Sequence, residues 1–503
     1  IGPGRDLFRQ PPRRSFYLLI KPCIFEPSIP AARAFMSTTS PPAIAIIGGG
    51  FSGSFTAVQL IRQHRQPLRI LLFNCRYPVA RGIAYDTYSD EHLLNVKAGN
   101  MSAIDGEPDH FVNWFLQQAE GKGLDPGQVP FMFLPRSVYG RYLSDVFEQQ
   151  LLRLPPGVSV EIVQQEVTDL RREDHHWSIV TEPGRRIKAE AVVLATGNSL
   201  PGTPSGLTGI SESSRYCGNP WLESCVVTTH EREVLIVGTG LTMVDIVLGL
   251  RGKGYTGTII AISPKGFDIL PHRNFPPHKA ILDELREPYH IDQLVRVFRQ
   301  HVFAIRKLGI SGEAVVDALR SKTQEIWQQL SSREKRQFIQ HLRHLWGMAR
   351  HRLPFTIHEQ IQREIRKGSL IIRAGRILSA SEEQTRIKLE IRPRGSDATE
   401  TLRVDRVINC TGPQPDIRKV ASPLLQRLTD RGLIVPHELN LGIEATADGR
   451  IIDSDGNAQA DFLTLGTLLR GALWESTAVP ELRVQAAGVA RHLVDLLATR
   501  TTP

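Results

Sequence analysis

The stretch Ala43-Ile-Ala-Ile-Ile-Gly-Gly-Gly-Phe-Ser-Gly53 decides the fold predicted for this chain of 503 residues. Its first five residues are apolar and predict a short strand that is buried on both faces. The glycines lead into a helical pattern, Ser54 to Gln63, and then into a second apolar run, Leu68 to Phe73. A strand, a glycine loop, a helix and a strand within about 30 residues predict a βαβ unit of a parallel sheet.

The loop Gly48-x-Gly50-x-x-Gly53 has the spacing of a dinucleotide-binding turn. We expect Gly48 to permit the tight turn, Gly50 to let a pyrophosphate approach the backbone, and Gly53 to let the helix pack closely on the strand. Free N–H groups at the helix start, where Ser52 lies, would face the phosphates. The second strand ends in Asn74 instead of the usual acid, so a neutral hydrogen bond to the adenosine ribose is expected.

A second glycine loop, Gly238-Thr-Gly-Leu-Thr-Met243, lies between apolar runs at 234–237 and 258–262, which predicts a second βαβ unit. Its first two glycines keep the phosphate cradle, while Met243 replaces the third and loosens the packing of the helix on the strand. The residues predicted to bind a dinucleotide here are Gly238, Gly240 and Thr242.

The strand after the second loop ends in Ser263-Pro-Lys265-Gly266. A hydroxyl and a cation stand where sites specific for NAD carry an acid, and both would favour a 2′-phosphate. The pattern therefore favours NADPH over NADH, although Lys265 could also be an ordinary solvated turn residue.

Each βαβ unit is followed by a later strand that ends in Thr-Gly, first at Ala195-Thr196-Gly197 and then at Cys410-Thr411-Gly412. These are the points where we expect the chain to pass between two dinucleotide-binding domains. Residues 278–367 show a helical pattern and predict an insertion, either a substrate lid or a dimerisation surface. The predicted organisation is a disordered leader or upstream extension (1–40), a first domain in two parts (41–215 and 413–503), and a second domain (216–412) that carries the insertion.

Other elements follow from the same patterns of apolar residues. Further strands are predicted at 158–167, 177–181, 187–194, 370–372, 386–391, 402–408 and 462–465, and helices at 333–352 and 479–497.

The two glycine loops with their Thr-Gly strand ends resemble the flavoproteins with two dinucleotide-binding domains, of the glutathione-reductase-like fold. Longer stretches are similar to bacterial FAD/NAD(P)-binding oxidoreductases related to N-hydroxylating flavin monooxygenases. These stretches are Gly82-Ile-Ala-Tyr85, His92-Leu-Leu-Asn-Val96, Ala98-Gly-Asn-Met-Ser102, Pro135-Arg-Ser-Val-Tyr-Gly140, Arg350-His-Arg352 and Trp474-Glu-Ser-Thr-Ala-Val-Pro-Glu-Leu-Arg483.

The resemblance implies that FAD occupies the first site and NAD(P)H the second. It places Asn95 and Met101 near the flavin ring and Val167 near the adenine, and it aims the start of the 479–497 helix at the flavin. Where relatives carry Gly-Asp before this helix, the chain has Gly466-Thr467, so a neutral hydrogen bond replaces a carboxylate. The full predicted cofactor set is Gly48, Gly50, Ser52, Gly53, Asn74, Asn95, Met101, Val167, Thr196, Gly197, Gly238, Gly240, Thr242, Ser263, Lys265, Gly412, Gly466 and Thr467.

Three functions stay open. The first is a monooxygenase-like enzyme that takes hydride from NAD(P)H and acts on a small metabolite. The second is an NAD(P)H-dependent reductase or dehydrogenase that does not activate oxygen, and the third is a non-catalytic FAD/NAD(P)-binding regulatory protein. Flavin disulfide reductase chemistry is not expected, because the five cysteines form no C-x-x-C pair and fit a reducing, cytoplasmic compartment.

Two arginines, Arg350 and Arg352, are candidates to clamp a substrate carboxylate, with a surface ion pair as the alternative. No metal site is predicted, because His341, His344 and His351 share a predicted helix with no acidic ligand between them. The flavin itself would supply the chemistry, so no catalytic side chain is predicted.

The charge and composition exclude several other classes of protein. Sixty-one Lys and Arg against 52 Asp and Glu give a net charge of +9, but residues 1–35 hold six bases and two acids and so carry +4 of it. The remaining charges form no dense basic stripe, so no nucleic-acid partner is expected. No apolar run is long enough to span a membrane.

Overall fold

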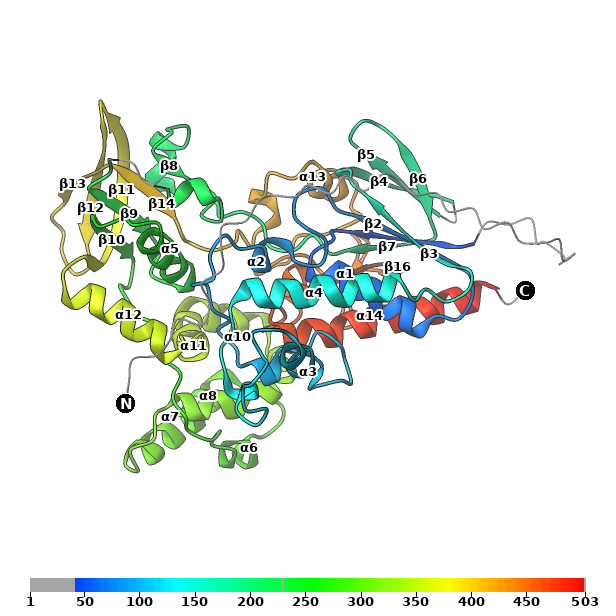
Figure 1. The fold of residues 1–503 in the computed structure, drawn as a ribbon, viewed down its shortest axis with the longest axis horizontal. Coiled ribbons are helices and arrows are strands. Elements are labelled where there is room, and N and C mark those ends of the chain that lie inside the picture. The colour runs from blue at the N-terminus through cyan, green and yellow to red at the C-terminus, as the bar shows by residue number, and fades with distance from the viewer. Residues whose placement is uncertain (1–40, 175, 228–229, 502–503) are drawn as a thin grey trace, which may run out of the picture.

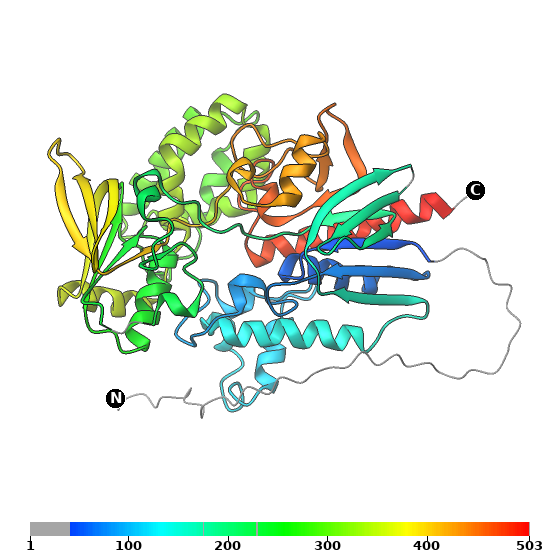
Figure 2. The ribbon, with the colours of Figure 1, turned by 90° about the horizontal axis from the view of Figure 1, so that it is seen from above.

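The computed structural model describes residues 41–501 except 175, 228 and 229, and it arranges them in two lobes with a group of helices between and below them (Figure 1). The predicted leader, 1–40, lies outside the described residues. Each lobe is built on a mainly parallel sheet, which confirms the predicted α/β fold. Two chain segments, 195–204 and 410–416, cross between the lobes side by side, with Gln414 N donating to Leu200 O (3.3 Å) (Figure 2).

The first lobe contains a six-stranded sheet in the order β15-β16-β7-β1-β2-β3. Its central strand, β1, pairs in parallel with both β2 and β7 and is buried over its whole length, as the apolar run predicts. The strands are β1 (Ala43–Ile47), β2 (Leu68–Phe73), β3 (Val158–Val163), β7 (Ala191–Leu194), β15 (Arg450–Ile452) and β16 (Ala458–Thr464).

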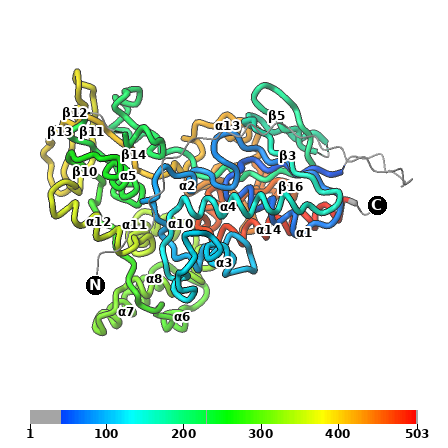
Figure 3. The backbone as a smooth tube through the Cα atoms, viewed as in Figure 1, coloured from blue at the N-terminus to red at the C-terminus, as the bar shows by residue number. Residues whose placement is uncertain are grey.

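Helices cover one face of this sheet and a small sheet covers the other. The helices α1 and α14 lie side by side against the first face although they come from opposite ends of the described chain (Figure 3). The elements of the two layers are α1 (Phe51–Gln63), α2 (Gly82–Tyr85), α3 (His110–Gln117), α4 (Arg136–Leu151) and α14 (Val479–Thr501) on one side, and β4 (Val167–Glu173), β5 (His176–Thr181), β6 (Arg186–Ala189) and α13 (Pro423–Asp430) on the other.

The second lobe contains a seven-stranded sheet in the order β13-β12-β11-β10-β9-β14-β8. Helices α5 and α12 pack on one face, and the turn at Ser205–Ile210 packs on the other. The elements are β8 (Tyr216–Cys217), β9 (Glu233–Val237), α5 (Leu241–Gly252), β10 (Thr258–Ser263), α12 (Phe355–Arg366), β11 (Leu370–Glu383), β12 (Arg386–Pro393), β13 (Glu400–Val404) and β14 (Arg406–Asn409).

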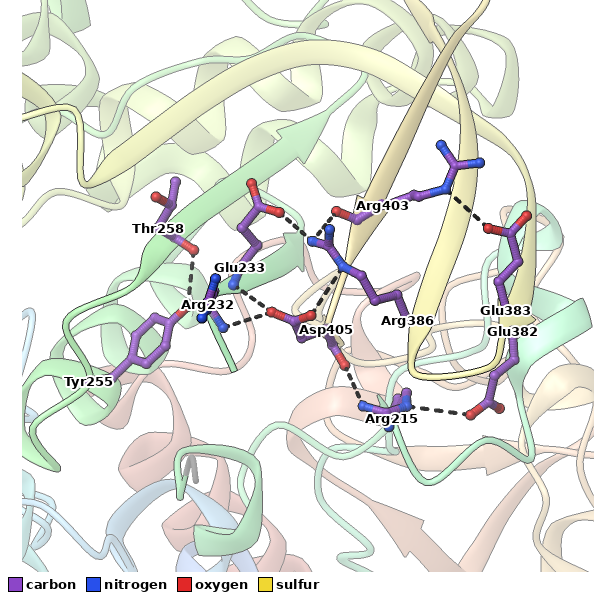
Figure 4. A network of polar contacts seen from close by, with 10 residues as sticks. All are labelled: Arg215, Arg232, Glu233, Tyr255, Thr258, Glu382, Glu383, Arg386, Arg403 and Asp405. Atoms are coloured by element: carbon purple, nitrogen blue, oxygen red, sulfur yellow. Dashed lines mark hydrogen bonds and ion pairs between the residues drawn. The ribbon is translucent and has the colours of Figure 1, made fainter. Parts of the chain in front are cut away.

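A network of polar contacts fixes the starting ends of the strands in this second sheet (Figure 4). The carboxylate of Asp405 accepts the backbone N–H groups of Arg232 (2.7 Å) and Glu233 (2.9 Å) and pairs with Arg386 (3.1 Å). These bonds and Arg386 hold the pKa of the Asp405 carboxyl below its usual value, against the effect of burial. The network lies at the end of the strands opposite the glycine loop, so it stabilises the lobe without taking part in the site.

The predicted insertion is helical, with α6 (Ala280–Glu284), α7 (Ile291–Arg306), α8 (Glu313–Leu319), α9 (Thr323–Gln329), α10 (Ser332–Gln337) and α11 (Arg343–Arg350) preceding α12. A π-helical turn, Phe338–Leu342, joins α10 to α11. The insertion packs on the first lobe through aromatic rings, with Trp327 and Trp474 5.0 Å apart between ring centroids. Part of the insertion thus packs against the first lobe, while α6, α7 and α8 enclose a small hydrophobic core of their own.

Several element boundaries differ from the predictions. The predicted strand 158–167 is two strands, because the chain leaves the main sheet after Val163 and enters the small sheet at Val167. The predicted strand 370–372 is the start of a much longer β11, whose second half pairs only with β12 and has a register shift between Ile377 and Ser379. Helices α3 and α4 were not predicted.

Two of the cysteines are paired in the structure, at a spacing that is not C-x-x-C. Cys217, on the edge strand β8, and Cys225 are joined by a disulfide across eight residues of sequence. Their spacing gave no signal, because the turn that brings them together is set by contacts with the rest of the lobe. The other two described cysteines, Cys75 and Cys410, are free.

The described residues contain neither a membrane-spanning helix nor a cluster of metal ligands. No described helix has both the length and the apolarity that a membrane crossing needs. Within the same residues, no group of three or more His, Cys, Asp or Glu side chains is placed to hold a metal ion.

Candidate functional site

Two positions of the first glycine loop, Gly48 and Gly53, have no room for a side chain. Gly48 has a φ of +113°, and a Cβ there would overlap the carbonyl oxygen of Ala195 at the end of β7. A Cβ at Gly53 would overlap the carbonyl oxygen of Gly48, so the start of α1 lies directly against the turn. These two glycines therefore have the roles in the turn and in the packing that their spacing predicts.

Two glycines, Gly50 and Gly82, lie against each other beside the start of α1. Gly50 is the residue before α1. A Cβ on Gly82 would lie 3.2 Å from the Cα of Gly50, so a side chain on either glycine would crowd the other. The first turn of α1 has no capping side chain and no acidic residue. Its N–H groups and the positive end of the helix are therefore available to an anion, which fits a pyrophosphate.

Asn74 lies at the end of β2, where a ribose is expected. Its Nδ2 donates to Tyr77 O (2.7 Å), and its side chain lies against Gly49, where a Cβ would lie 2.6 Å from the Asn74 Cβ. The amide thus shapes the following turn and keeps Oδ1 as an acceptor for a hydroxyl group.

The C-terminal part of the chain reaches the same loop. Gly466 has a φ of +75°, and a Cβ there would lie 3.4 Å from the hydroxyl oxygen of Ser52 on α1. Thr467 Oγ1 donates to Asn198 Oδ1 (2.9 Å), which joins this segment to the end of β7. Ser476 Oγ donates to Gly466 O (2.9 Å), so the turn before α14 is held against the glycine loop.

Other predicted residues of the first site are spread around this loop. Met101 is buried in the core of the lobe, and Val167 begins β4 and pairs with Thr181. Thr196 and Gly197 follow β7 directly, and Gly197 has a φ of +70°.

His272 contacts the predicted flavin segment and was missed in the sequence. Its Nε2 lies 3.0 Å from Asn95 O, and its ring centroid is 4.8 Å from that of Phe133. Burial, and after it the positive charges of Arg352 and Lys97, lower the pKa of His272 to about 4, although the bond to Asn95 opposes the shift. The imidazole is therefore neutral near pH 7, with Nε2–H donating to the Asn95 carbonyl.

The second glycine loop repeats the geometry of the first. Gly238 has a φ of +114°, and a Cβ there would overlap the carbonyl oxygen of Cys410 at the end of β14. A Cβ on Gly48 would overlap the carbonyl oxygen of Ala195 in the same way. Gly240 precedes α5 and has open space around it, and the first turn of α5 has neither a capping side chain nor an acid. The residue in place of the third glycine, Met243, is buried.

The predicted residues around this loop surround the same strand ends. Ser263 Oγ lies 3.0 Å from Thr239 Oγ1 and accepts from Gly266 N (3.0 Å), which fixes the turn that carries Lys265. The Lys265 side chain is exposed, Thr242 lies in the first turn of α5, and Gly412, with a φ of +87°, follows β14.

The two candidate clamp arginines already have partners in the protein. Arg350 pairs with Glu475 (3.3 Å), and both side chains are about nine-tenths buried. Arg352 is buried and pairs with Asp317. A substrate carboxylate would have to compete with these two acids for the guanidinium groups.

A third arginine, Arg470, directly follows the turn Gly466–Leu469 and lies near the charges of Arg343 and Glu475. Among the described residues its guanidinium makes no ion pair, and burial together with the charge of Arg343 lowers its pKa. Its neighbour in the loop, Glu475, is engaged by Arg350 and accepts a hydrogen bond from Trp346 Nε1 (2.8 Å). Arg470 is thus the cation that remains available to an anion near the Gly466 turn.

An ion pair joins the lobes beside the second loop. Asp245, on α5, pairs with Arg136 at the start of α4 (2.9 Å), and both side chains are largely buried. The backbone oxygen of Asp245 also lies 2.9 Å from His92 Nε2, in the segment predicted to follow the flavin. The helix that follows the second loop is therefore fixed directly to the first lobe.

Comparison with known proteins gives one family and one fold. Residues 45–199 match the family model described as FAD-NAD(P)-binding. No curated protein sequence matches the chain.

The fold of nearly the whole chain is similar to that of solved flavin enzymes. The ornithine N-hydroxylase of Kutzneria sp. 744, described with reduced FAD, NADP+ and L-ornithine, has a TM-score of 0.63 at 14% identity over 92% of this chain and 100% of its own. The L-lysine 6-monooxygenase of Pseudomonas syringae has a TM-score of 0.61 at 16% identity, over 91% of this chain and 99% of its own. Thioredoxin reductase of Lactococcus lactis has a TM-score of 0.50 at 11% identity, over 91% and 99%. The fold of two dinucleotide-binding domains is therefore confirmed.

Proposed function

Because residues 45–199 match the family model described as FAD-NAD(P)-binding, we propose that the chain is an FAD-dependent oxidoreductase that takes hydride from NADPH and hydroxylates a small metabolite with oxygen. The observation that carries this proposal is the repeated glycine turn, with Gly48 against Ala195 in one lobe and Gly238 against Cys410 in the other. Two uncapped helix starts that follow such turns suit two dinucleotides, which an oxidoreductase needs and a sensor does not.

Residues of the first lobe would hold FAD. Gly48, Gly50 and Gly53 would bring the backbone to the pyrophosphate, and Asn74 would accept a ribose hydroxyl. Bound FAD would supply the redox chemistry. The start of α14, held by Arg320 through Glu481 (2.9 Å), would place its positive end near the ring.

The second lobe would hold the nicotinamide coenzyme against this site. The pair between Asp245 and Arg136 holds α5, and with it the second glycine loop, in a fixed position relative to the first lobe. Lys265, at the end of β10, supports NADPH as the coenzyme, because a cation favours a 2′-phosphate there.

The substrate would bind between the Gly466 turn and the insertion. Arg470 has no ion pair within the described part of the chain, so it would hold an anionic group of the substrate, as Arg350 and Arg352 were first expected to do. The neutral His272, with Nε2–H donating to Asn95 O, would offer Nδ1 as an acceptor to the substrate. Two of the structurally similar enzymes named above, the ornithine N-hydroxylase and the L-lysine 6-monooxygenase, act on amino acids, which carry such an anionic group.

The test follows oxygen and coenzyme consumption by the purified, FAD-loaded protein. We expect bleaching of the flavin by NADPH and, with the right small carboxylate among a panel of candidate substrates, incorporation of one atom of labelled dioxygen into the product. Flavin bleaching without label in any product would support the reductase instead. A protein that cannot be loaded with FAD would contradict the proposal.

A further inference from the structure

A group of cations lies at the end of β10, where two parts of the second lobe meet the insertion. Lys265 stands in the turn after β10, and Arg394 follows β12 and reaches the same turn, with Nη1 donating to Lys265 O (3.5 Å) and its backbone N–H donating to Ala374 O (2.9 Å). Both side chains are exposed. The turn itself is fixed, since Gly266 has a φ of +63° and a Cβ there would lie 2.8 Å from the Ala374 Cβ.

The insertion closes this group from the other side through the first turn of α11. The ring of His344 stacks on the ring of Phe267, with 5.7 Å between the centroids and 12° between the planes. His344 is thereby held beside Lys265, two residues before Phe267, and Arg343 is its neighbour on the helix. Burial, and then the positive charges of Lys265, Arg343 and Arg394, lower the pKa of His344.

These positive charges have no counter-charge in the protein. Within the residues that the structure describes, Lys265, Arg343 and Arg394 form no ion pair, and the charges that act on His344 are all positive. Most arginines of this lobe do have an acidic partner, such as Arg386 with Asp405 and Arg373 with Glu400. Like charges that are brought together without a partner repel, so this arrangement suits a ligand that brings negative charge.

The position in the fold identifies the anion. The end of the second strand of a dinucleotide-binding unit is where the adenosine ribose lies. A phosphate on the 2′-oxygen would bring close to two negative charges and three acceptor oxygens to this place. Inorganic phosphate shares the chemistry but lacks the adenosine that the second glycine loop would hold beside it.

We propose that His344 and Arg343 of the insertion, together with Lys265 and Arg394, form the binding site for the 2′-phosphate of NADPH. This inference rests on the proposed function for the identity of the coenzyme. The insertion then has a role other than that of a substrate lid or a dimerisation surface. Its helix α11 selects the coenzyme. The signal was not visible in the sequence, because Arg394 and His344 lie far from the glycine loop along the chain.

The test measures binding by isothermal titration calorimetry on the FAD-loaded protein, with 2′,5′-ADP and 5′-ADP as probes. We expect 2′,5′-ADP to bind at least about tenfold more tightly than 5′-ADP. The variants His344→Gln and Arg394→Gln should each weaken 2′,5′-ADP binding about five- to tenfold and leave 5′-ADP binding unchanged. Arg296→Gln, which removes an exposed arginine elsewhere in the insertion, serves as the control and should change neither.

The outcomes separate this inference from the proposed function. Equal binding of the two probes, or a loss in the control as large as in the variants, would overturn the 2′-phosphate site even if NADPH still bleaches the flavin. Displacement of 2′,5′-ADP by inorganic phosphate at equal concentration would show a general anion site and also overturn it. If the probes are distinguished but NADPH does not bleach the flavin, the site stands and the proposed function fails.

Discussion

Single residues decide the geometry of both glycine turns, and these were the residues most readily predicted. Gly48, Gly53 and Gly238 each sit where a Cβ would overlap a backbone carbonyl oxygen. Glycine in such a place leaves a spacing in the sequence that can be read directly. No sequence pattern predicts the contact between His272 and Asn95, because this contact depends on how the lobes meet.

Replacing Gly48 by alanine should abolish FAD loading and destabilise the first lobe. The new Cβ would overlap Ala195 O, and a φ of +113° is strained for any other residue, at a cost of about 1–3 kcal/mol before the overlap is counted. The ratio of flavin to protein absorbance and the thermal midpoint measure both effects.

The control for this substitution is Gly488→Ala. Gly488 lies within α14, and a Cβ there meets no atom within 4 Å. Alanine is the better helix former by about 1 kcal/mol, so this variant should keep FAD and gain slightly in stability. Retention of FAD by Gly48→Ala would contradict the assignment of the turn.

The histidine that contacts the flavin segment should make stability depend on pH. The pKa of His272 is lowered from 6.5 to about 4, so the unfolded chain binds a proton that the folded one does not between these values. The stabilisation is complete above about pH 6.5 and is lost as the pH falls towards 4, by up to about 3 kcal/mol.

Urea unfolding between pH 7 and 4 tests this dependence. His272→Gln should flatten the curve of unfolding free energy against pH relative to the native protein. His230→Gln, at an exposed position, should leave the curve unchanged. Identical slopes for the native protein and His272→Gln would show that His272 does not titrate in this range.

At the scale of elements, the strands around the glycine loops were predicted well and the helices poorly. β1 and β2 were predicted with their observed bounds because fully buried parallel strands are continuous apolar runs. Helix α4 was missed because it has polar residues on much of its surface, and the contact that orders it, a cluster of aromatic rings around Tyr139 and Tyr142, comes from distant segments. The length of β11 was missed because half of it pairs outside the main sheet.

The candidate site shows the same division. Each glycine loop could be predicted because the residues that shape it are close together in the sequence. The partners of Arg350 and Arg352 could not, because Glu475 and Asp317 come from other elements and reach the arginines only through the packing of the insertion.

Removing the charge of Glu475 should destabilise the contact between α11 and the loop before α14. Glu475→Gln keeps an acceptor for Trp346 but leaves Arg350 buried without its counter-charge, which we expect to cost about 3–5 kcal/mol. Urea unfolding with flavin fluorescence as the signal measures the loss. Glu182→Gln, at an exposed position, should shift the midpoint very little, and a matching small shift for Glu475→Gln would mean that the pair is dispensable.

At the scale of the whole molecule, the lobes meet through a few buried polar groups and an aromatic contact from the insertion. The pair between Asp245 and Arg136 fixes α5 to the first lobe, while the rings of Trp327 and Trp474 contact each other at a tilt between the insertion and that lobe. The relative position of the lobes therefore depends on a small number of side chains.

Substituting Asp245 by asparagine should loosen the two lobes without unfolding either. The shape is kept, but Arg136 loses the charge that it faces, at a cost of about 3–5 kcal/mol to the contact. We expect faster hydrogen exchange in α5 and a slower reduction of the flavin by NADPH, with the FAD content unchanged. Asp495→Asn, on the exposed side of α14, should alter neither, and unchanged exchange in Asp245→Asn would show that the lobes are held elsewhere.

The contact between α1 and α14 bears on how the protein is made. The ribosome releases the first glycine loop early, but β16 and α14, which complete the core around it, follow only after the whole second lobe. The second lobe is one uninterrupted stretch and is therefore free to fold while synthesis continues. The first lobe cannot complete its core until α14 has been synthesised. Before then its sheet exposes apolar residues that are buried in the complete protein. A chaperone that shields this nascent sheet would protect the chain during the interval.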